Sequence, residues 1–254
     1  MEQGEFRIFV FDKPLIDVLP LVGGYARHFS IEDDGVNVFR DLRQVEYAAG
    51  AMAPPIRRFE DVGATFRSVE EFEHFPLVFR LIEMEVGSPF CIFDTSISIH
   101  DTLGPDYFAD DFCGARFIKF RYAEYEGQPG LSEMSVKIGR KVIRSVTAYQ
   151  DEEDAQGKSR WKFAQYGAPQ PWEDTSNYTR RQIKDRLNRD ILIDYMTNFG
   201  LDFDRVARGD FHRVVEFAER SEGSTLEIYD EECKRLRRAL EDYLFALTGG
   251  RPCD

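Results

Sequence analysis

The chain has 254 residues, which is enough for one large domain or two small ones with a sizeable buried core. Hydrophobic residues make up 43% of the chain and aromatic residues 14%, a composition that excludes an intrinsically disordered protein. The formal net charge of −13 argues against a nucleic-acid partner, because binding to phosphates depends on Lys and Arg.

The acidic charge is concentrated in the N-terminal region of the chain. Residues 1–111 carry 9 Lys and Arg against 21 Asp and Glu, whereas residues 112–254 carry 24 against 25. Such charge serves solubility, and it also suits a surface that meets a basic protein partner. For the second interpretation, the candidate partner-binding residues are Asp33, Asp34, Asp106, Asp110 and Asp111.

The termini and the cysteines predict the compartment. Residues 1–5 lack the basic and apolar regions of a signal peptide, and no apolar run approaches the ~18 residues of a membrane span. The four cysteines are dispersed, without the spacing of a zinc site or of a disulfide framework. We therefore expect a cytoplasmic protein with no membrane partner and no cofactor.

The first elements in chain order are predicted to be strands around one short helix. Residues 6–11 alternate with apolar side chains on both faces, which is typical of a central strand. A short helical turn is predicted to follow and to end at Leu19, before Pro20. Asp34-Gly35 lies between the β-rich runs 25–31 and 36–42 and predicts a hairpin.

The middle of the chain predicts a sheet. An irregular connection is expected at 48–65 and a brief helix at 69–74. Branched and aromatic residues then predict strands at 77–86, 90–99, 116–125, 134–150 and 160–166. Their connections are short and contain no helix, which favours antiparallel neighbours in a meander.

After Trp172 the apolar period changes to that of helices. Apolar residues recur every four positions from Ile183 to Phe199 and predict one long helix that ends at Gly200. A second helix is predicted at 210–221. A third is predicted at 224–248, and its spacing is typical of a helix packed on another helix. That neighbour is a helix of the same chain or of a second subunit. The sequence therefore allows a dimer through this helix as an alternative.

These elements together predict an α+β protein that forms a single domain over residues 1–254. A mostly antiparallel sheet over about residues 5–166 makes up a sheet-rich region, residues 1–167. Three C-terminal helices, within a helical region at residues 174–249, are expected to pack on that sheet.

The loop 100–111 is the strongest catalytic candidate. Its acidic residues and histidine offer oxygen and imidazole ligands to a divalent cation. The spacing matches no metal motif, and a solvated turn-rich loop explains the same composition. A metal-dependent hydrolase is therefore one alternative function, and a small-ligand receptor with an apolar pocket is another. The candidate metal ligands are His100, Asp101, Asp106, Asp110 and Asp111.

The segment 161–186 predicts a structural joint between sheet and helices. On the expected helix, Arg181 would pair with Asp185, and Arg186 with Asp190, four residues apart. Its aromatic residues are expected in the core, although exposed ones would instead mark a partner site. The predicted joint residues are Trp161, Phe163, Trp172, Arg181, Asp185 and Arg186.

The same segment resembles one found in uncharacterised bacterial proteins. The shared pattern is W-x-F-x3-G-x-P-x-P-[WF]-E-D, then a Tyr, then R-x-I-x-D-R and a final Tyr. It covers about a seventh of the chain, and the resemblance implies no activity beyond a bacterial accessory or immunity-type protein. The residues that carry it are Trp161, Phe163, Gly167, Pro169, Pro171, Trp172, Glu173, Asp174, Tyr178, Arg181, Ile183, Asp185, Arg186 and Tyr195.

The charge layout and the lack of a catalytic signature lead to one functional prediction. We expect a non-catalytic, soluble bacterial binding protein, of the immunity or inhibitor type. Its acidic N-terminal face is expected to engage a basic protein.

Overall fold

The computed structural model describes residues 5–26, 29–33, 36–40, 42–48, 78–95, 116–124, 130–139, 141–151 and 159–219. Its strands are β1 (Glu5–Phe11), β2 (Phe29–Asp33), β3 (Val36–Arg40), β4 (Leu42–Ala48), β5 (Val78–Glu83), β6 (Cys91–Thr95), β7 (Arg116–Ala123), β8 (Leu131–Ile138), β9 (Lys141–Gln150), β10 (Trp161–Gly167) and β11 (Arg213–Glu219). Its helices are α1 (Leu15–Ala26), the 3-10 helices η2 (Thr175–Thr179) and η3 (Ile183–Asp185), α4 (Arg189–Phe199) and α5 (Phe203–Arg208).

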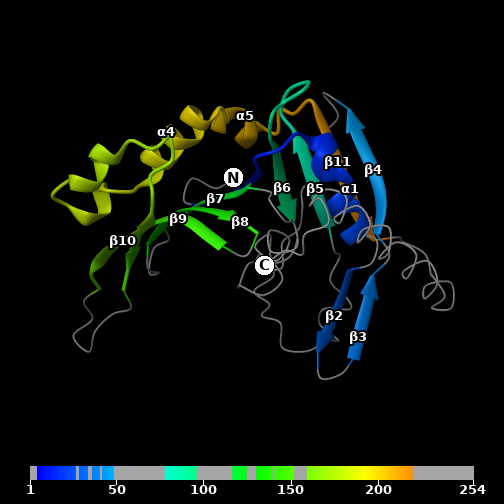
Figure 1. Cartoon of the computed structure of the whole chain (residues 1–254), viewed down its shortest axis with the longest axis horizontal. Coiled ribbons are helices and arrows are strands. Elements are labelled where there is room, and N and C mark those ends of the chain that lie inside the picture. The colour runs from blue at the N-terminus through cyan, green and yellow to red at the C-terminus, as the bar shows by residue number, and fades with distance from the viewer. Residues whose placement is uncertain are drawn as a thin grey trace.

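A nine-stranded antiparallel sheet dominates the fold. Its strand order is β10-β9-β8-β7-β1-β6-β5-β11-β4, and Figure 1 shows β10 and β4 at its opposite ends. β2 and β3 form a separate hairpin, in which Asp33 lies opposite Val36, so the predicted hairpin is confirmed. Among the helices in the described ranges, none combines the length and the apolarity that a membrane span needs.

β1 lies at the centre of the sheet, between β6 and β7, as its alternating sequence predicts. Phe6, Ile8 and Val10 project to one face, and Phe9 and Phe11 project to the other, because successive strand side chains alternate. All five side chains are buried. The sheet therefore supports a core on each face.

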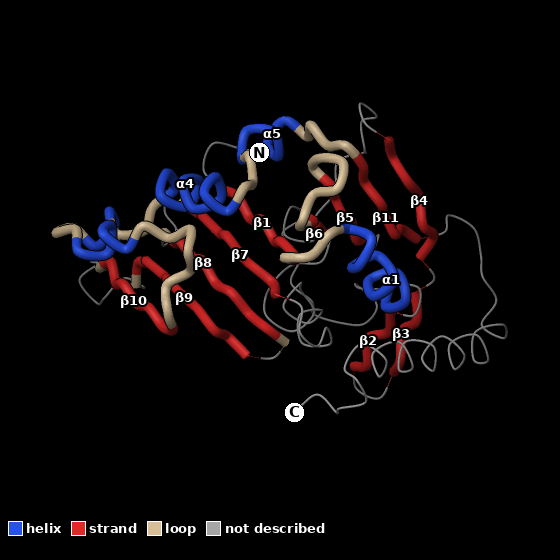
Figure 2. The backbone as a smooth tube through the Cα atoms, turned by 45° about the horizontal axis from the view of Figure 1, so that its top comes forward, coloured by secondary structure: helices blue, strands red, loops and turns tan. Residues whose placement is uncertain are grey.

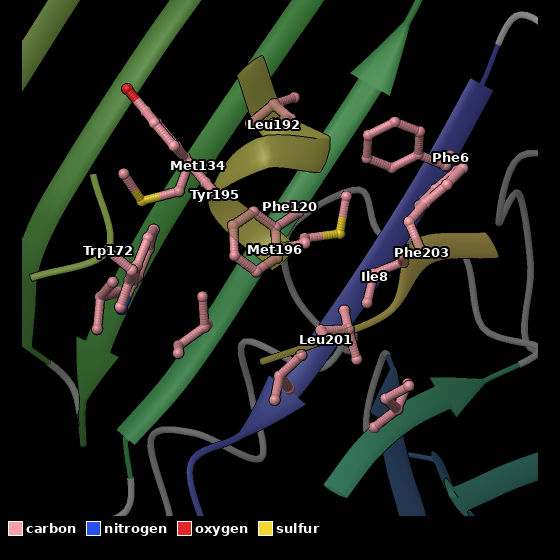
Figure 3. Packing of buried hydrophobic residues seen from close by; sticks show 14 of the residues in the cluster. Phe6, Ile8, Phe120, Met134, Trp172, Leu192, Tyr195, Met196, Leu201 and Phe203 are labelled. Atoms are coloured by element: carbon pink, nitrogen blue, oxygen red, sulfur yellow. The ribbon is translucent and has the colours of Figure 1, made fainter. Parts of the chain in front are cut away.

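The first core lies between the sheet and α4. Figure 3 shows Leu192, Tyr195 and Met196 of α4 beside Phe120 and Trp172. The buried positions of α4 recur one, four and five residues apart, so they form one apolar stripe. Each fully buried side chain of this kind contributes roughly 1.5–3 kcal/mol of transfer free energy.

The second core lies on the opposite face, under α1. Phe11 packs against Phe93 and Phe117, with ring centroids 5.8 and 5.1 Å away. Gly23 of α1 lies so close to β11 that a Cβ there would be 3.2 Å from the ring of Phe217. The two helices thus cover different faces, and Figure 2 shows them over different halves of the sheet.

α1 is longer than predicted. The sequence predicts that the helix ends at Leu19, but α1 continues through Pro20 to Ala26. Leu15, Val18 and Val22 are buried on one side of the helix. Packing of that apolar side stabilises the helix, which offsets the backbone hydrogen bond that Pro20 cannot donate.

The sheet is a meander only to a limited extent. β7 to β10 follow one another as predicted, but β1 lies between β6 and β7, and β11 lies between β5 and β4. The predicted strand at 134–150 is in fact two strands, β8 and β9. Gly139, with φ of 54°, lies between them, and the register shifts between Val136 and Lys137.

The predicted group of three C-terminal helices is not confirmed. Residues 210–221, predicted to be helical, contain β11, which pairs with both β5 and β4. Phe211, Val214, Val215 and Ala218 have helical spacing, but residues 213–218 have a paired strand on both sides, which satisfies their backbone hydrogen-bonding groups. The predicted helix 224–248, and with it a dimer through that helix, lies outside the described residues, as does the brief helix predicted at 69–74.

The predicted long helix is also wrong in its first half. Residues 175–188 form two short 3-10 turns, η2 and η3, and the α-helix begins only after Asn188. The side chain of Asn188 accepts a hydrogen bond from the backbone N–H of Ile191 at 3.0 Å, which is an N-cap. Gly200 ends α4 in the left-handed conformation, as predicted.

Candidate functional site

Most of the predicted partner-binding and metal-binding residues cannot be placed. Asp33 is the last residue of β2, and only its backbone is described. Elsewhere in the described ranges, no three His, Cys, Asp or Glu side chains come together as metal ligands would. The residues outside those ranges are Asp34, His100, Asp101, Asp106, Asp110 and Asp111.

One group of buried ionisable side chains gathers where β9 and α4 meet segment 167–180. We call Arg144, Glu173, Tyr178 and Tyr195 the junction cluster. Arg144 Nε lies 3.0 Å from Glu173 Oε1, and Arg144 Nη2 lies 2.7 Å from Glu173 Oε2. The two side chains are 1% and 0% exposed, so this ion pair is shielded from water.

Further hydrogen bonds complete the junction cluster. Glu173 also accepts from the backbone N–H of Gln170 and from the hydroxyl of Tyr178, both at 2.7 Å. Arg144 also donates to the backbone carbonyl of Gly167 at 2.8 Å. Buried charges are tolerated when each is paired and its remaining hydrogen-bonding groups are satisfied, and this pair meets both conditions.

The pKa directions fix the charges in the cluster. Burial lowers the pKa of Arg144, but its hydrogen bonds and attraction to Glu173 outweigh burial, and the net pKa is raised. Burial and the hydrogen bond to Glu173 raise the pKa of Tyr178. Burial also raises the pKa of Tyr195, whose hydroxyl donates to the backbone carbonyl of Asp174 at 3.0 Å. At neutral pH both tyrosines are neutral hydrogen-bond donors. Tyr178 donates within segment 167–180, and Tyr195 joins that segment to α4.

The predicted joint residues surround this cluster in two different ways. Trp172 is buried, and Trp161 and Phe163 are half-buried against the same core. Arg181 is exposed, while Asp185 and Arg186 are half-buried. The Arg186 guanidinium lies 5.6 Å from the ring centroid of Phe163, a cation–π contact.

The predicted helical pairing of these charges is wrong. Arg181, Asp185 and Arg186 precede α4, so no helix aligns residues four positions apart. Arg186 Nε instead donates to the backbone carbonyl of Arg180 at 2.9 Å. Arg180 in turn donates to the backbone carbonyl of Asp185 at 3.3 Å. The arginines therefore close a loop rather than line a helix.

Sequence reasoning missed Arg144 altogether. Its position has the same parity as Val146 and Ala148, which face the core of β9. An arginine in an inward-facing register requires a buried acidic partner, and this was the available signal. The identity of that partner follows only from the fold, because Glu173 lies 29 residues away.

A second buried ion pair links strands from distant regions of the chain. Arg80 of β5 and Glu216 of β11 lie opposite each other and approach to 2.5 Å. The hydroxyl of Tyr47 on β4 donates to Glu216 at 3.3 Å. Burial, followed by the charge of Glu216, raises the pKa of Tyr47. The three side chains tie β11 to both of its neighbours.

Surface ion pairs also join the acidic N-terminal region to the rest of the chain. Glu46 pairs with Arg213 at 2.9 Å, and Glu85 pairs with Arg205 at 2.6 Å. Asp12 pairs with Arg116 at 3.2 Å. The fold therefore neutralises some of the N-terminal acidic residues with C-terminal cations.

The end of the sheet at β10, together with the segment that follows this strand, is basic. Residues 159–189 carry seven Arg and Lys against three Asp and Glu, and one of the three is the buried Glu173. The exposed cations of this basic end are Arg160, Lys162, Arg180, Arg181 and Lys184.

Comparison of the chain with protein families, with curated proteins and with solved structures finds no match.

Proposed function

We propose that the protein is a non-catalytic bacterial binding protein, of the immunity or inhibitor type, that acts in the cytoplasm. The observation that carries the proposal is the excess of acid in residues 1–111, with 21 Asp and Glu against 9 Lys and Arg. A surface of one charge sign attracts a partner of the opposite sign and speeds association. The partner is therefore a basic protein.

The described ion pairs reduce the number of acidic residues that are available to a partner. Asp12, Glu46 and Glu85 each have an arginine within 3.2 Å, so some of their charge is neutralised within the fold. The binding surface is accordingly assigned to other acidic residues of the N-terminal region. The residues assigned to it are Asp33, Asp34, Asp106, Asp110 and Asp111.

The buried ionisable residues support a binding role. Arg144 with Glu173, and Arg80 with Glu216, are each engaged in a contact between distant segments of the fold. The tyrosines beside them are neutral at neutral pH, because burial raises the pKa of Tyr47 and Tyr178. These groups therefore serve the stability of the fold.

Capture from a lysate of the native host at increasing ionic strength tests the proposal. We expect a basic protein to be retained at low salt and released at high salt, because screening weakens contacts between exposed charges. A triple variant, Asp106→Asn with Asp110→Asn and Asp111→Asn, is expected to retain much less of it. The matched control removes three exposed acidic residues elsewhere, through Asp190→Asn, Asp194→Asn and Asp204→Asn.

Two results would overturn this function. One is retention that depends neither on salt nor on the triple variant. The other is calorimetric binding of Mg2+, Mn2+ or Ca2+ that is lost in the triple variant. That second result would instead favour the metal-dependent hydrolase built on loop 100–111.

A further inference from the structure

β10 is an open edge of the sheet. It pairs with β9 alone among the described strands, and Figures 1 and 2 place it at the end of the sheet. Its seven residues contain neither a proline nor a bulge, two of the devices that protect edge strands, although Lys162 is a charged residue near its start. The residues from Ala164 to Gly167 are exposed, and Tyr166 is 61% exposed.

The direction of its main-chain groups follows from the register. Asp151 donates to the carbonyl of Arg160 at 3.0 Å, so that pair is hydrogen-bonded. Hydrogen-bonded and non-hydrogen-bonded pairs alternate along an antiparallel ladder. The next residue and every second one after it therefore direct their N–H and C=O groups away from β9. Before the strand ends at Gly167, these residues are Trp161, Phe163 and Gln165.

The surroundings of this edge are basic. Arg160 precedes Trp161, Lys162 follows it and pairs with Asp151 at 2.5 Å, and η3, which carries Lys184, packs against β10. Residues 159–189 hold seven Arg and Lys against three Asp and Glu, within a chain whose net charge is −13. Among the described residues of this edge, cations therefore outnumber acids even when Asp151 is included.

We infer that β10 is a docking edge for an extended acidic segment of a partner protein, which adds to the sheet as a further strand. The outward N–H and C=O groups of Phe163 and Gln165 match the main chain of another strand, as in strand-addition complexes. The exposed cations select acidic side chains on the incoming segment. A second copy of this chain is disfavoured, because two basic edges would repel each other.

A labelled octapeptide that alternates Glu with Val and Thr is the probe, and hydrogen exchange is the measurement. On binding, we expect the amides of Phe163 and Gln165 to become protected, because they gain partners on the incoming strand. The amide of Tyr166 already faces β9 and is expected to be unchanged. A peptide with Lys at every Glu position is expected not to bind.

Two variants of one residue provide a matched pair. Gln165→Pro removes the outward N–H, whereas Gln165→Val keeps it. Both variants lose the weak contact of 3.4 Å between the Gln165 side chain and Arg144. We expect the proline variant alone to weaken peptide binding, by about tenfold. Arg181→Glu with Lys184→Glu changes exposed residues only and is expected to weaken binding at low salt.

Several results would overturn the inference. Equal binding by the proline and valine variants would show that the peptide does not hydrogen-bond to the backbone N–H of residue 165. A short oligothymidylate that binds more tightly than the acidic peptide would identify the edge as a nucleic-acid surface. Protection of the same amides by self-association, without peptide, would identify a second copy as the occupant. Because the inferred contacts are made by β10 and not by the residues proposed for the basic partner, the Asp106, Asp110 and Asp111 variant is expected to bind the peptide normally.

Discussion

The carboxylate of Glu173 joins three segments of the chain, because it accepts from Arg144 on β9, from the backbone of Gln170 and from Tyr178 of η2. Removal of one partner of a buried ion pair leaves the other charge without compensation. Exposed pairs behave differently, because water replaces the lost partner. Position in the fold, rather than distance between the charges, therefore decides what each ion pair contributes to stability.

We predict that Glu173→Ala lowers the free energy of unfolding by about 3–5 kcal/mol, measured by urea denaturation at pH 7. The control is Lys162→Ala, whose exposed side chain pairs with Asp151 at 2.5 Å and is expected to change stability little. A double variant, Arg144→Met with Glu173→Leu, is expected to cost less than the two single changes added together. Strict additivity would show that the two charges do not depend on each other.

The raised pKa of Tyr178 predicts a loss of stability in alkali. An ordinary tyrosine has a pKa of 10.0, and burial followed by the hydrogen bond to Glu173 raises that of Tyr178 in the folded state. The ionisation of Tyr178 therefore does not change the stability well below pH 10. Above it, stability falls as pH rises toward the folded-state pKa, because the unfolded chain loses the proton more readily.

Tyr178→Phe removes this titration. Between pH 10 and 11 we expect the unfolding free energy of the variant to fall by about 1 kcal/mol less than that of the native chain, because the tyrosine of the unfolded chain is only half deprotonated at pH 10. At pH 8 the variant is expected to be less stable, because Glu173 loses the hydrogen bond from the hydroxyl. Parallel curves in urea denaturation over this pH range would contradict the assignment.

At the scale of elements, the end of β10 is set by its last residue. Gly167 has φ of 78°, and a Cβ there would lie 1.9 Å from the carbonyl oxygen of Ile143 on β9. Only glycine permits both this conformation and this approach of two backbones. The chain leaves the sheet at this point for the proline-rich segment that carries Glu173.

A pair of alanine variants separates the two requirements. Gly87 also has positive φ, of 71°, but no atom lies within 4 Å of a Cβ built there. We predict a loss of about 1–2 kcal/mol for Gly87→Ala, from backbone strain alone. Gly167→Ala is expected to lose clearly more in urea denaturation, because β9 and β10 must also move apart. Equal losses would mean that the close approach adds nothing.

Elements with local signals were predicted well. The alternation in residues 6–11 and the turn residues between β2 and β3 are properties of short stretches, and both elements form as predicted. β11 was predicted as a helix because its apolar spacing fits both periods, and only the gap between β5 and β4 decides between them. The prediction of a helix before residue 189 was wrong for a different reason, since Asn188 caps α4 and the α-helix begins only after it.

The candidate site depends on contacts between distant residues. The sequence shows that residues 1–111 are acidic, but not that Glu46 meets Arg213, which is 167 residues away. The sequence predicts that the charges of this segment pair with one another along a helix, because Arg181 and Asp185 are four positions apart. In the structure Arg181 is exposed between the two 3-10 turns, and the second turn, η3, packs against β10. Local spacing gave the charges but not their neighbours.

At the scale of the whole molecule, one sheet runs from β10 to β4 with cores on both faces. The prediction of a single domain requires that damage at one end of the sheet be felt at the other. The chain provides a natural probe, because it has two tryptophans, Trp161 on β10 and Trp172, which packs against Phe120 of β7, and both strands lie on the same side of β1. Phe217 lies on β11, next to the opposite edge.

Phe217→Ala tests this coupling. Phe217 is fully buried, so its loss is expected to cost about 3–5 kcal/mol through the cavity it leaves. We predict equal shifts of the tryptophan fluorescence and far-ultraviolet circular dichroism transitions in urea. Ile16→Ala, at a side chain that is 69% exposed, is the control and is expected to shift neither. A fluorescence transition that stays in place would show two independently folding units.

The position of β11 also has a consequence for biosynthesis. β4 and β5 leave the ribosome long before residues 213–219, yet neither can pair on that side until β11 arrives. During translation the nascent chain therefore carries two strand edges that are open to pairing with other chains. We expect general chaperones to bind the emerging polypeptide in this interval and to leave once β11 closes the sheet.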